Sequence, residues 1–87
     1  MENKNTFYRP VPDLVETGAK IKSLRIKNGY SICKLKEELG FNNPQTIYFW
    51  ETGKYLPSID NLLVLSYLFH VTINDIIVTN KTDNKPD

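Results

Sequence analysis

Apolar residues recur along this chain at helical spacing, in five short runs that turn residues separate. In the first run Leu14, Ile21 and Leu24 fall on one helical face. Asp13, three residues before Glu16, is typical of a capping box at the start of that helix. No segment reads as a convincing strand, so the pattern predicts an all-α fold built from five short helices.

Capping residues indicate where the other helices begin and end. The predicted starts of the second, third, fourth and fifth helices are Ser31, Asn43, Ser58 and Thr72. Gly40 is predicted to end the second helix, and His70 to act as the C-terminal cap of the fourth. Thr72 and Asp75 have the spacing of a second capping box, which favours a short fifth helix.

The third predicted helix, residues 43–52, separates core residues from display residues. Ile47 and Trp50 stand at i, i+3 and point inward, and Gly53 ends the helix, since glycine easily adopts positive φ. The outward positions are Gln45, Thr46, Tyr48 and Phe49. A short helix between two sharp turns that exposes polar and aromatic side chains is suited to presenting a binding surface.

A chain of 87 residues has room for one domain. We predict a flexible N-terminal arm over residues 1–12, a folded domain over 13–78 and a disordered polar tail over 79–87. The net charge is only +1, but residues 20–54 hold seven Lys or Arg against three Glu, a local net of +4. This uneven distribution favours a nucleic-acid partner.

Composition argues against several other classes of protein. The longest apolar run, residues 62–65, is too short to cross a membrane, and the N-terminus lacks a signal peptide, so a cytoplasmic location is expected. Cys33, the single cysteine, cannot form an internal disulfide and is interpreted as a small apolar filler. With one cysteine and one histidine, no metal site is expected, and no nucleophile–base pair indicates an enzyme.

Four segments of the chain together resemble one family. They are L-R-I-K-N-G-Y-S at 24–31, L-x3-L-G at 35–40, I-Y-x-W-E-x-G-K-x-x-P-S at 47–58 and D-N-L-x-x-L-S at 60–66. The combination resembles the Cro/repressor-type, or XRE, helix-turn-helix family over about residues 14–78. The resemblance implies a compact five-helix domain of the phage-repressor type that binds double-stranded DNA without a cofactor. It also implies a bacterial or phage-type, nucleoid-associated transcriptional regulator, usually a homodimer on a palindromic operator.

The resemblance assigns roles by position. It implies a partly buried ion pair between Arg25 and Glu51 that ties the first helix to the third. The base-reading positions of the family fall on Gln45 and Phe49, with Thr46 and Tyr48 beside them. The phosphate-contacting positions fall on Ser31, Ile32, Lys34, Lys36, Thr52, Lys54 and Tyr55. A glutamine can bond adenine twice at N6 and N7, and a phenylalanine can cover a thymine methyl.

The chain departs from the family pattern at four places. Ile32 stands where a glutamine usually contacts phosphate, and Lys36 stands where alanine is usual. The turn between Leu39 and Ile47 is one residue longer than in the commonest members. Phe49 stands where polar residues are more usual, so it either contacts a base or is covered by the arm or a partner.

A dimer surface is assigned to the outer face of the fourth and fifth helices, at Tyr67, Leu68, Val71 and Val78. Repression is the expected outcome, because a chain this small has little surface left for recruiting polymerase. Two alternatives stay open. An antitoxin would bind DNA and also block a toxin with its arm or tail, whereas a protein-interaction module would have kept the fold without DNA binding.

Overall fold

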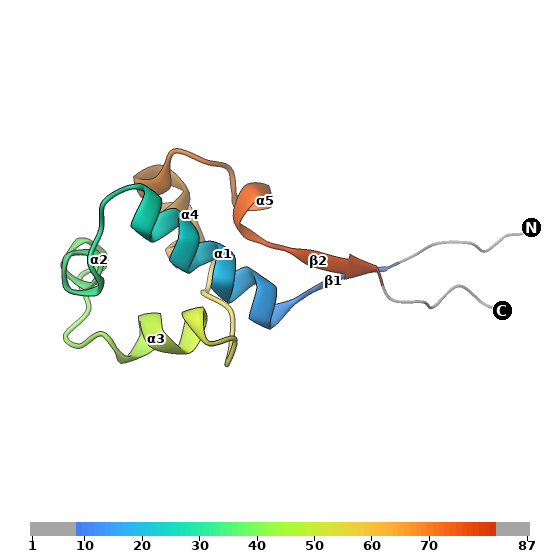
Figure 1. The fold of residues 1–87 in the computed structure, drawn as a ribbon, viewed down its shortest axis with the longest axis horizontal. Helices are drawn as coiled ribbons and strands as arrows, with labels where there is room; N and C mark the ends of the chain where they lie inside the picture. Colours follow the sequence, from blue (N-terminus) through green and yellow to red (C-terminus); the bar gives the residue numbers. More distant parts are fainter. Residues whose placement is uncertain (1–8, 82–87) are drawn as a thin grey trace, which may run out of the picture.

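Helices form the body of the structure, a computed structural model that describes residues 9–81 (Figure 1). Over these residues the elements in chain order are β1 (Pro10–Pro12), α1 (Leu14–Lys27), α2 (Ile32–Leu39), α3 (Gln45–Glu51), α4 (Ile59–Phe69), α5 (Ile73–Ile76) and β2 (Thr79–Lys81). The predicted fold of five helices is confirmed, with one small sheet added to it. In Figure 1 α1 lies at the centre, α2 at one end, and the β1–β2 ribbon at the opposite end. None of these helices is long and apolar enough to cross a membrane.

Side chains cap the starts of α1, α2 and α5 at the predicted residues. The Asp13 carboxylate accepts the backbone N–H of Glu16 at 2.9 Å, and the Ser31 hydroxyl accepts an N–H of the first turn of α2 at 3.0 Å. Thr72 and Asp75 form a complete capping box, in which each side chain accepts a backbone N–H of the other residue. These caps satisfy N–H groups that a helix leaves without an internal partner, so each fixes where its helix begins.

α3 begins at Gln45, with Pro44 as its N-cap, whereas the sequence predicts a helix over about 43–52 with Asn43 as its cap. The side-chain oxygen Oδ1 of Asn43 accepts the backbone N–H of Gln45 at 3.0 Å, and Pro44 lies just outside the helix. An asparagine that bonds the backbone two residues onward forms a turn of its own, which replaces the first helical turn expected at residue 43. Gly53 adopts the predicted positive φ, 82°, and Gly40 ends α2 as predicted with φ 76°, at the two turns that enclose α3.

The two ends of the described chain pair as an antiparallel ribbon. β1 lies along β2 with Val11 opposite Asn80. Thr17, fully buried on α1, holds the ribbon in place. Its hydroxyl accepts the backbone N–H of Val78 at 2.9 Å and donates to the Val78 carbonyl at 3.2 Å. The start of α1 is therefore tied to the segment that follows α5.

This ribbon corrects the expectation that the chain contains no strand. Strands of three residues, one of them with two prolines, show too little alternation to be recognised from sequence. The predicted arm (residues 1–12) and tail (residues 79–87) each contribute three residues to the sheet. Residues 1–8 and 82–87 of these two segments lie outside the described residues.

The hydrophobic core draws residues from all five helices. Its buried members are Ile21, Leu24, Leu35, Ile47, Trp50, Leu62, Leu65, Phe69 and Ile76. α3 packs closely on α1 at Gly18, where a Cβ would collide with the Trp50 carbonyl oxygen and lie 2.8 Å from that of Glu51. Contact with α1 therefore sets the position of α3, and its opposite face is left open.

Candidate nucleic-acid interface

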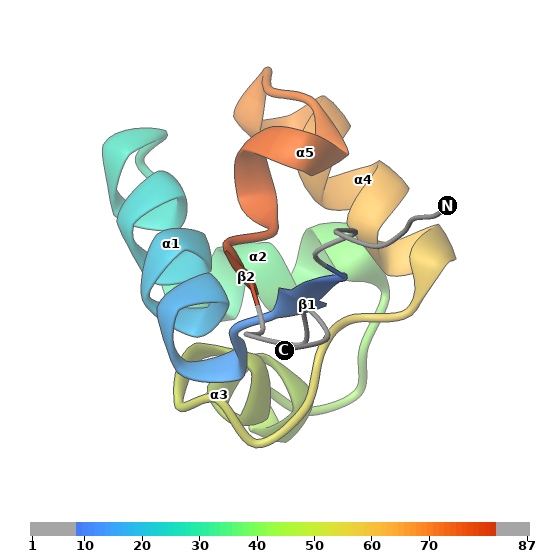
Figure 2. The same ribbon diagram turned by 90° about the vertical axis from the view of Figure 1, so that its right-hand side faces the viewer.

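α2 and α3 are joined by a turn whose two ends are fixed. Phe41 begins the turn and donates its N–H to the Lys36 carbonyl at 3.0 Å. Its ring packs edge-on against Trp50, with ring centroids 5.8 Å apart. In Figure 2 α3 lies below the other helices, along one side of the molecule. The turn therefore holds α2 and α3 as one unit against the core.

A buried ion pair anchors the end of α3 to α1. The Arg25 Nε donates to Glu51 Oε2 at 2.7 Å, and Nη2 donates to Oε1 at 3.2 Å. Nη1 donates to the Tyr30 carbonyl at 3.0 Å, so the guanidinium also holds the turn before α2. The two side chains are 10% and 6% exposed. A planar fork of this kind fixes the angle between two helices, and it joins the two residues that the family resemblance pairs.

α3 divides its side chains between the core and the surface as the sequence predicts. Ile47 and Trp50 are buried. On the other face Gln45 is exposed and the Tyr48 side chain is 48% exposed, while Thr46 is half-buried. The exposed face of α3 thus combines an amide, a hydroxyl and an aromatic side chain, which are groups that can contact the edges of bases.

The α2–turn–α3 arrangement is that of a known family. The helix-turn-helix family model matches residues 21–76, more than half of the chain. The chain belongs to the helix-turn-helix family. Its motifs are of the XRE type, so this helix-turn-helix protein has the fold of a DNA-binding domain with α3 as the second helix of the motif. A search of curated protein sequences gives no match.

Solved structures share the fold of this helix-turn-helix protein. The restriction-modification controller protein C.AhdI from Aeromonas hydrophila is 25% identical, with a TM-score of 0.65 over 74% of this chain and 96% of that one. The S. venezulae BldD DNA-binding domain is 18% identical, with a TM-score of 0.64 over 76% and 97%. The clp gene regulator ClgR from C. glutamicum is 21% identical, with a TM-score of 0.61 over 71% and 79%. The last two likenesses concern the fold alone.

The ring of Phe49 is half-buried beneath the turn that follows α3. The Tyr55 ring packs against it edge-on at 5.5 Å, and the Lys54 Nζ lies 5.3 Å from its centroid. The Lys54 N–H donates to the Phe49 carbonyl at 2.8 Å, and the Thr52 hydroxyl donates to the Tyr48 carbonyl at 2.8 Å. The cover over Phe49 therefore comes from its own turn. That turn presents Lys54 and Tyr55 at the edge of the helix-turn-helix surface.

The predicted phosphate-contacting residues at the start of α2 and along it lie in different environments. The Ser31 side chain caps the helix, and Ile32 is half-buried and packs against the core. The Lys34 ammonium lies 3.4 Å from Glu38 in an exposed ion pair. Such a pair contributes little and leaves the lysine free to meet another anion. Lys36 is half-buried, beside Pro44 of the turn.

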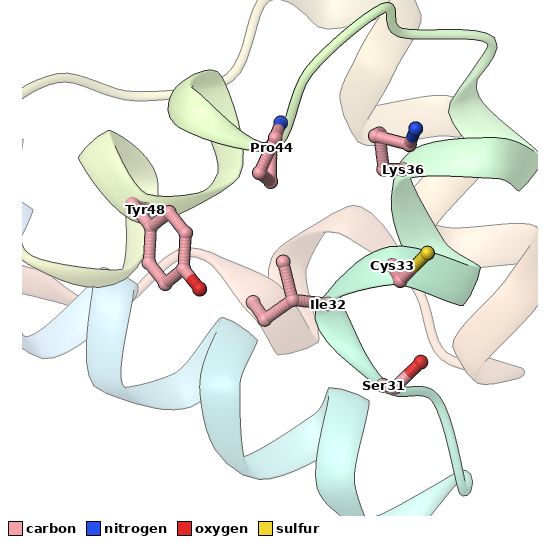
Figure 3. Close-up of a pocket in the computed structure, with 6 residues that line it drawn as sticks. All are labelled: Ser31, Ile32, Cys33, Lys36, Pro44 and Tyr48. Carbon is pink, nitrogen blue, oxygen red and sulfur yellow. The ribbon is translucent and has the colours of Figure 1, made fainter.

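A groove of about 390 Å³ opens between the start of α2 and the start of α3. Its lining residues are Ser31, Ile32, Cys33, Lys36, Pro44 and Tyr48. Figure 3 shows Ile32 of α2 and Tyr48 of α3 facing each other across it. This groove is not among the features predicted from the sequence. Ile32 in place of glutamine and the longer turn mark its position in the sequence, but neither departure by itself predicts a groove.

The interpretation of Cys33 as a small apolar filler is wrong. Cys33 is exposed on α2, and its Sγ lies 3.9 Å from Glu37 Oε2. Leu35, two residues further on, takes the buried position of that helix. Over the described residues no three His, Cys, Asp or Glu side chains gather in a group that could hold a metal ion.

The surface assigned to dimerisation is only partly open. Tyr67 is 78% exposed, whereas Leu68 and Val71 are half-buried and pack against the core. The exposed apolar residues of α4 follow a different line. Ile59 and Leu63 are 68% and 56% exposed and precede Tyr67 at spacings of four residues, so all three share one helical face.

Proposed function

We propose that this protein is a sequence-specific regulator that binds double-stranded DNA and reads the major groove with α3. The observation that supports this most directly is the anchoring of α3. Gly18 and the Arg25–Glu51 fork hold one side of the helix on α1, and Gln45 and Tyr48 stand exposed on the other. A rigid helix with an open polar and aromatic face suits the second position of a helix-turn-helix motif.

Base contacts are assigned to the exposed face and edges of α3. Gln45 would bond an adenine at N6 and N7, with Thr46 and Tyr48 contacting neighbouring base edges. Phe49 would contact a thymine methyl at the edge of the site, while its ring supports Lys54 and Tyr55. Gln45, Tyr48 and Phe49 are neighbours on α3 at helical spacing, and Thr46 is three residues before Phe49.

Phosphate contacts are assigned to the two ends of the motif. At the start of α2, Ser31 and the backbone N–H of Ile32 meet the helix end that favours negative charge, with Lys34 and Lys36 nearby. At the end of α3 the turn supplies the contacts of Thr52, Lys54 and Tyr55. Contacts on both sides of α3 would fix its register on the duplex, which is the role that phosphate contacts have in general.

Two copies of the chain would bind a palindromic operator as a homodimer. Half-sites one helical turn apart, at ~34 Å, are the expected arrangement. The exposed line of Ile59, Leu63 and Tyr67 on α4 supports pairing of two copies through this helix. Repression is the proposed outcome, and the likeness to the controller protein C.AhdI supports a regulatory role.

The test is selection from a pool of random DNA duplexes, with sequencing of the retained molecules at about 50 and about 200 mM salt. Enrichment of one palindromic motif, lost in Gln45→Ala and kept in Asn74→Ala on the exposed surface of α5, is the expected result. Retention without enrichment would reduce the function to non-specific binding. Absence of retention at both salt concentrations would reject DNA binding and favour the protein-interaction module.

A further inference from the structure

The groove between α2 and α3 has an apolar wall on the surface that we assign to DNA. We propose that it receives the 5-methyl group of a thymine, which makes Ile32 a specificity-determining residue. The inference rests on the proposed function and extends it, because it assigns base readout to a residue of α2 in a position whose usual glutamine contacts phosphate.

The geometry of the groove supports an apolar occupant. Ile32 and Tyr48 face each other across it, and Pro44 closes the end toward the turn (Figure 3). Ile32 packs against the hydrophobic core, so its side chain is held in place and cannot turn away to leave a polar surface. A volume of about 390 Å³ leaves space for the edge of a pyrimidine as well as its methyl group.

An anion is a poor fit to the same wall. Ile32 has no polar side-chain atom, and Pro44 has no backbone N–H to donate. The Ser31 oxygen accepts a backbone N–H in the α2 cap, so Ser31 keeps its O–H as a donor, but that donor does not belong to the apolar wall of Ile32 and Pro44. A phosphate set against Ile32 and Pro44 would therefore find no donor on that wall, and a polar group without partners is costly.

The polar part of the groove distinguishes thymine from cytosine. In the major groove thymine presents the O4 acceptor beside its methyl group, whereas cytosine presents an N4 amino donor and no methyl. Lys36, which lines the groove, offers only donors. Thymine would therefore place its methyl group against the apolar wall, and the donors of Lys36 would suit its O4, whereas cytosine has neither a methyl group nor an acceptor at that position.

The position of the groove places the thymine next to the base assigned to Gln45. Pro44 precedes Gln45 directly, and Tyr48 lies on the next turn of α3, on the side of the groove. The methyl contact would therefore extend the base-reading residues of α3 toward α2. Readout would come from both helices of the motif.

Replacement of thymine by deoxyuridine removes only the methyl group and tests this directly. In the motif selected from the random pool, each thymine is replaced in turn and the dissociation constant is measured for the full chain. We expect one thymine in each half-site at which the change weakens binding about fourfold, the factor for burial of one methyl-sized group. The same replacement of thymine by deoxyuridine should leave the dissociation constant of the Ile32→Ala variant unchanged, because that variant lacks the isoleucine side chain that the methyl group would contact.

Two further variants keep the result interpretable. Tyr48→Leu changes an exposed residue of the groove and leaves the buried core residues unaltered. In this variant we expect replacement of the same thymine by deoxyuridine to weaken binding less than it does in the wild type. Phe49→Leu alters the other candidate methyl contact and should leave the effect intact. Changing the base and the side chain separately and then together gives the coupling energy between the methyl group and the side chain. A general loss of stability in a variant affects both DNA sequences equally and cancels.

Three results would overturn the inference. A motif with no uracil-sensitive thymine, or a sensitivity equal in wild type and Ile32→Ala, would reject the methyl contact and leave the proposed function standing. A sensitivity lost only in Phe49→Leu would assign the methyl to α3 instead. A pool with no enriched motif would reject the proposed function and the inference together.

Discussion

At the scale of single residues, a missing side chain determines where α3 lies. Gly18 stands in the middle of α1, a position in which glycine normally weakens a helix. Here it allows the backbone of α3 to approach α1 more closely than any Cβ would permit. The ion pair between Arg25 and Glu51 also joins α1 to α3. The surface of α3 is therefore placed by backbone contact and by one ion pair.

Replacement of Gly18 tests this contact, because the contact determines whether the variant is more or less stable than the wild type. By helix propensity alone, Gly18→Ala would stabilise the fold by about 1 kcal/mol. Because the new Cβ meets backbone atoms that cannot rotate away, we expect a destabilisation of about 1–3 kcal/mol instead. Urea unfolding measures the difference, with Ser23→Ala on the exposed face of α1 as a control that should stay within about 0.5 kcal/mol. A gain in stability for Gly18→Ala would contradict the close approach.

Lys54 tests the phosphate contacts at the same scale. Its ammonium lies over the Phe49 ring, so its place on the surface is fixed. We expect Lys54→Gln to weaken binding to the selected motif and to unrelated duplexes alike, and to reduce the log–log salt slope by about 0.9. Lys20→Gln is the matched control, because Lys20 acts electrostatically on Asp75 of α5 and is assigned no DNA contact. An equal loss in both variants would indicate only a general charge effect.

At the scale of elements, the ends of the helices depend on residues in the left-handed region. His70 ends α4 with φ 58°, although it carries a Cβ. Gly40 ends α2 with φ 76°, and a Cβ there would meet no atom. The two sites therefore share one backbone conformation and differ in whether the residue suits it.

Introducing a glycine at one of these caps and removing it at the other should change the stability of the fold in opposite directions. We expect His70→Gly to stabilise the fold by up to about 1 kcal/mol, and Gly40→Ala to destabilise it by about 1–2 kcal/mol. Thermal and urea unfolding of both variants would measure this. A loss of stability in His70→Gly would mean that the imidazole itself supports the cap.

These elements also show which features can be predicted from sequence. Caps and turn glycines bond or bend the backbone within a few residues of themselves, so local spacing is enough to recognise them. They are Ser31, Gly40, Gly53 and the Thr72–Asp75 capping box. The β1–β2 ribbon depends on the bonds between Thr17 and Val78, which lie far apart in the chain. The cover on Phe49, the exposure of Cys33 and the groove at Ile32 likewise depend on how helices and turns pack. Spacing along a sequence does not contain that information.

At the scale of the whole molecule, three carboxylates near the starts of helices make stability depend on pH. The Glu16 N–H lowers the pKa of Asp13, the Ser58 hydroxyl lowers the pKa of Asp60, and the Thr72 N–H lowers the pKa of Asp75, each from an ordinary value of 3.8. In the folded state these groups therefore stay ionised to lower pH than in the unfolded chain. Their contribution to stability is present above the ordinary value and is lost as the pH falls through the lowered values.

We therefore expect the free energy of unfolding to change little between about pH 7 and about pH 5, and to fall below about pH 4. Urea unfolding across this range would measure it. Asp75→Asn should reduce the size of the acid-dependent fall, because it removes one of the three groups. A fall of unchanged size in that variant would mean that other carboxylates cause the acid dependence.

The proposed dimerisation through α4 can be tested on the whole molecule. Ile59, Leu63 and Tyr67 expose one apolar line on a helix whose other face fills the core. Because Leu63 is central to the line and mostly exposed, Leu63→Glu should place a charge in a paired surface without disturbing the fold. We expect it to shift sedimentation toward the monomer and to weaken binding to a palindromic site about a hundredfold, while binding to an isolated half-site stays unchanged. Ser23→Glu adds the same charge on the exposed face of α1 and should alter neither measurement. An unchanged dimer in Leu63→Glu would assign the pairing of two copies to another surface.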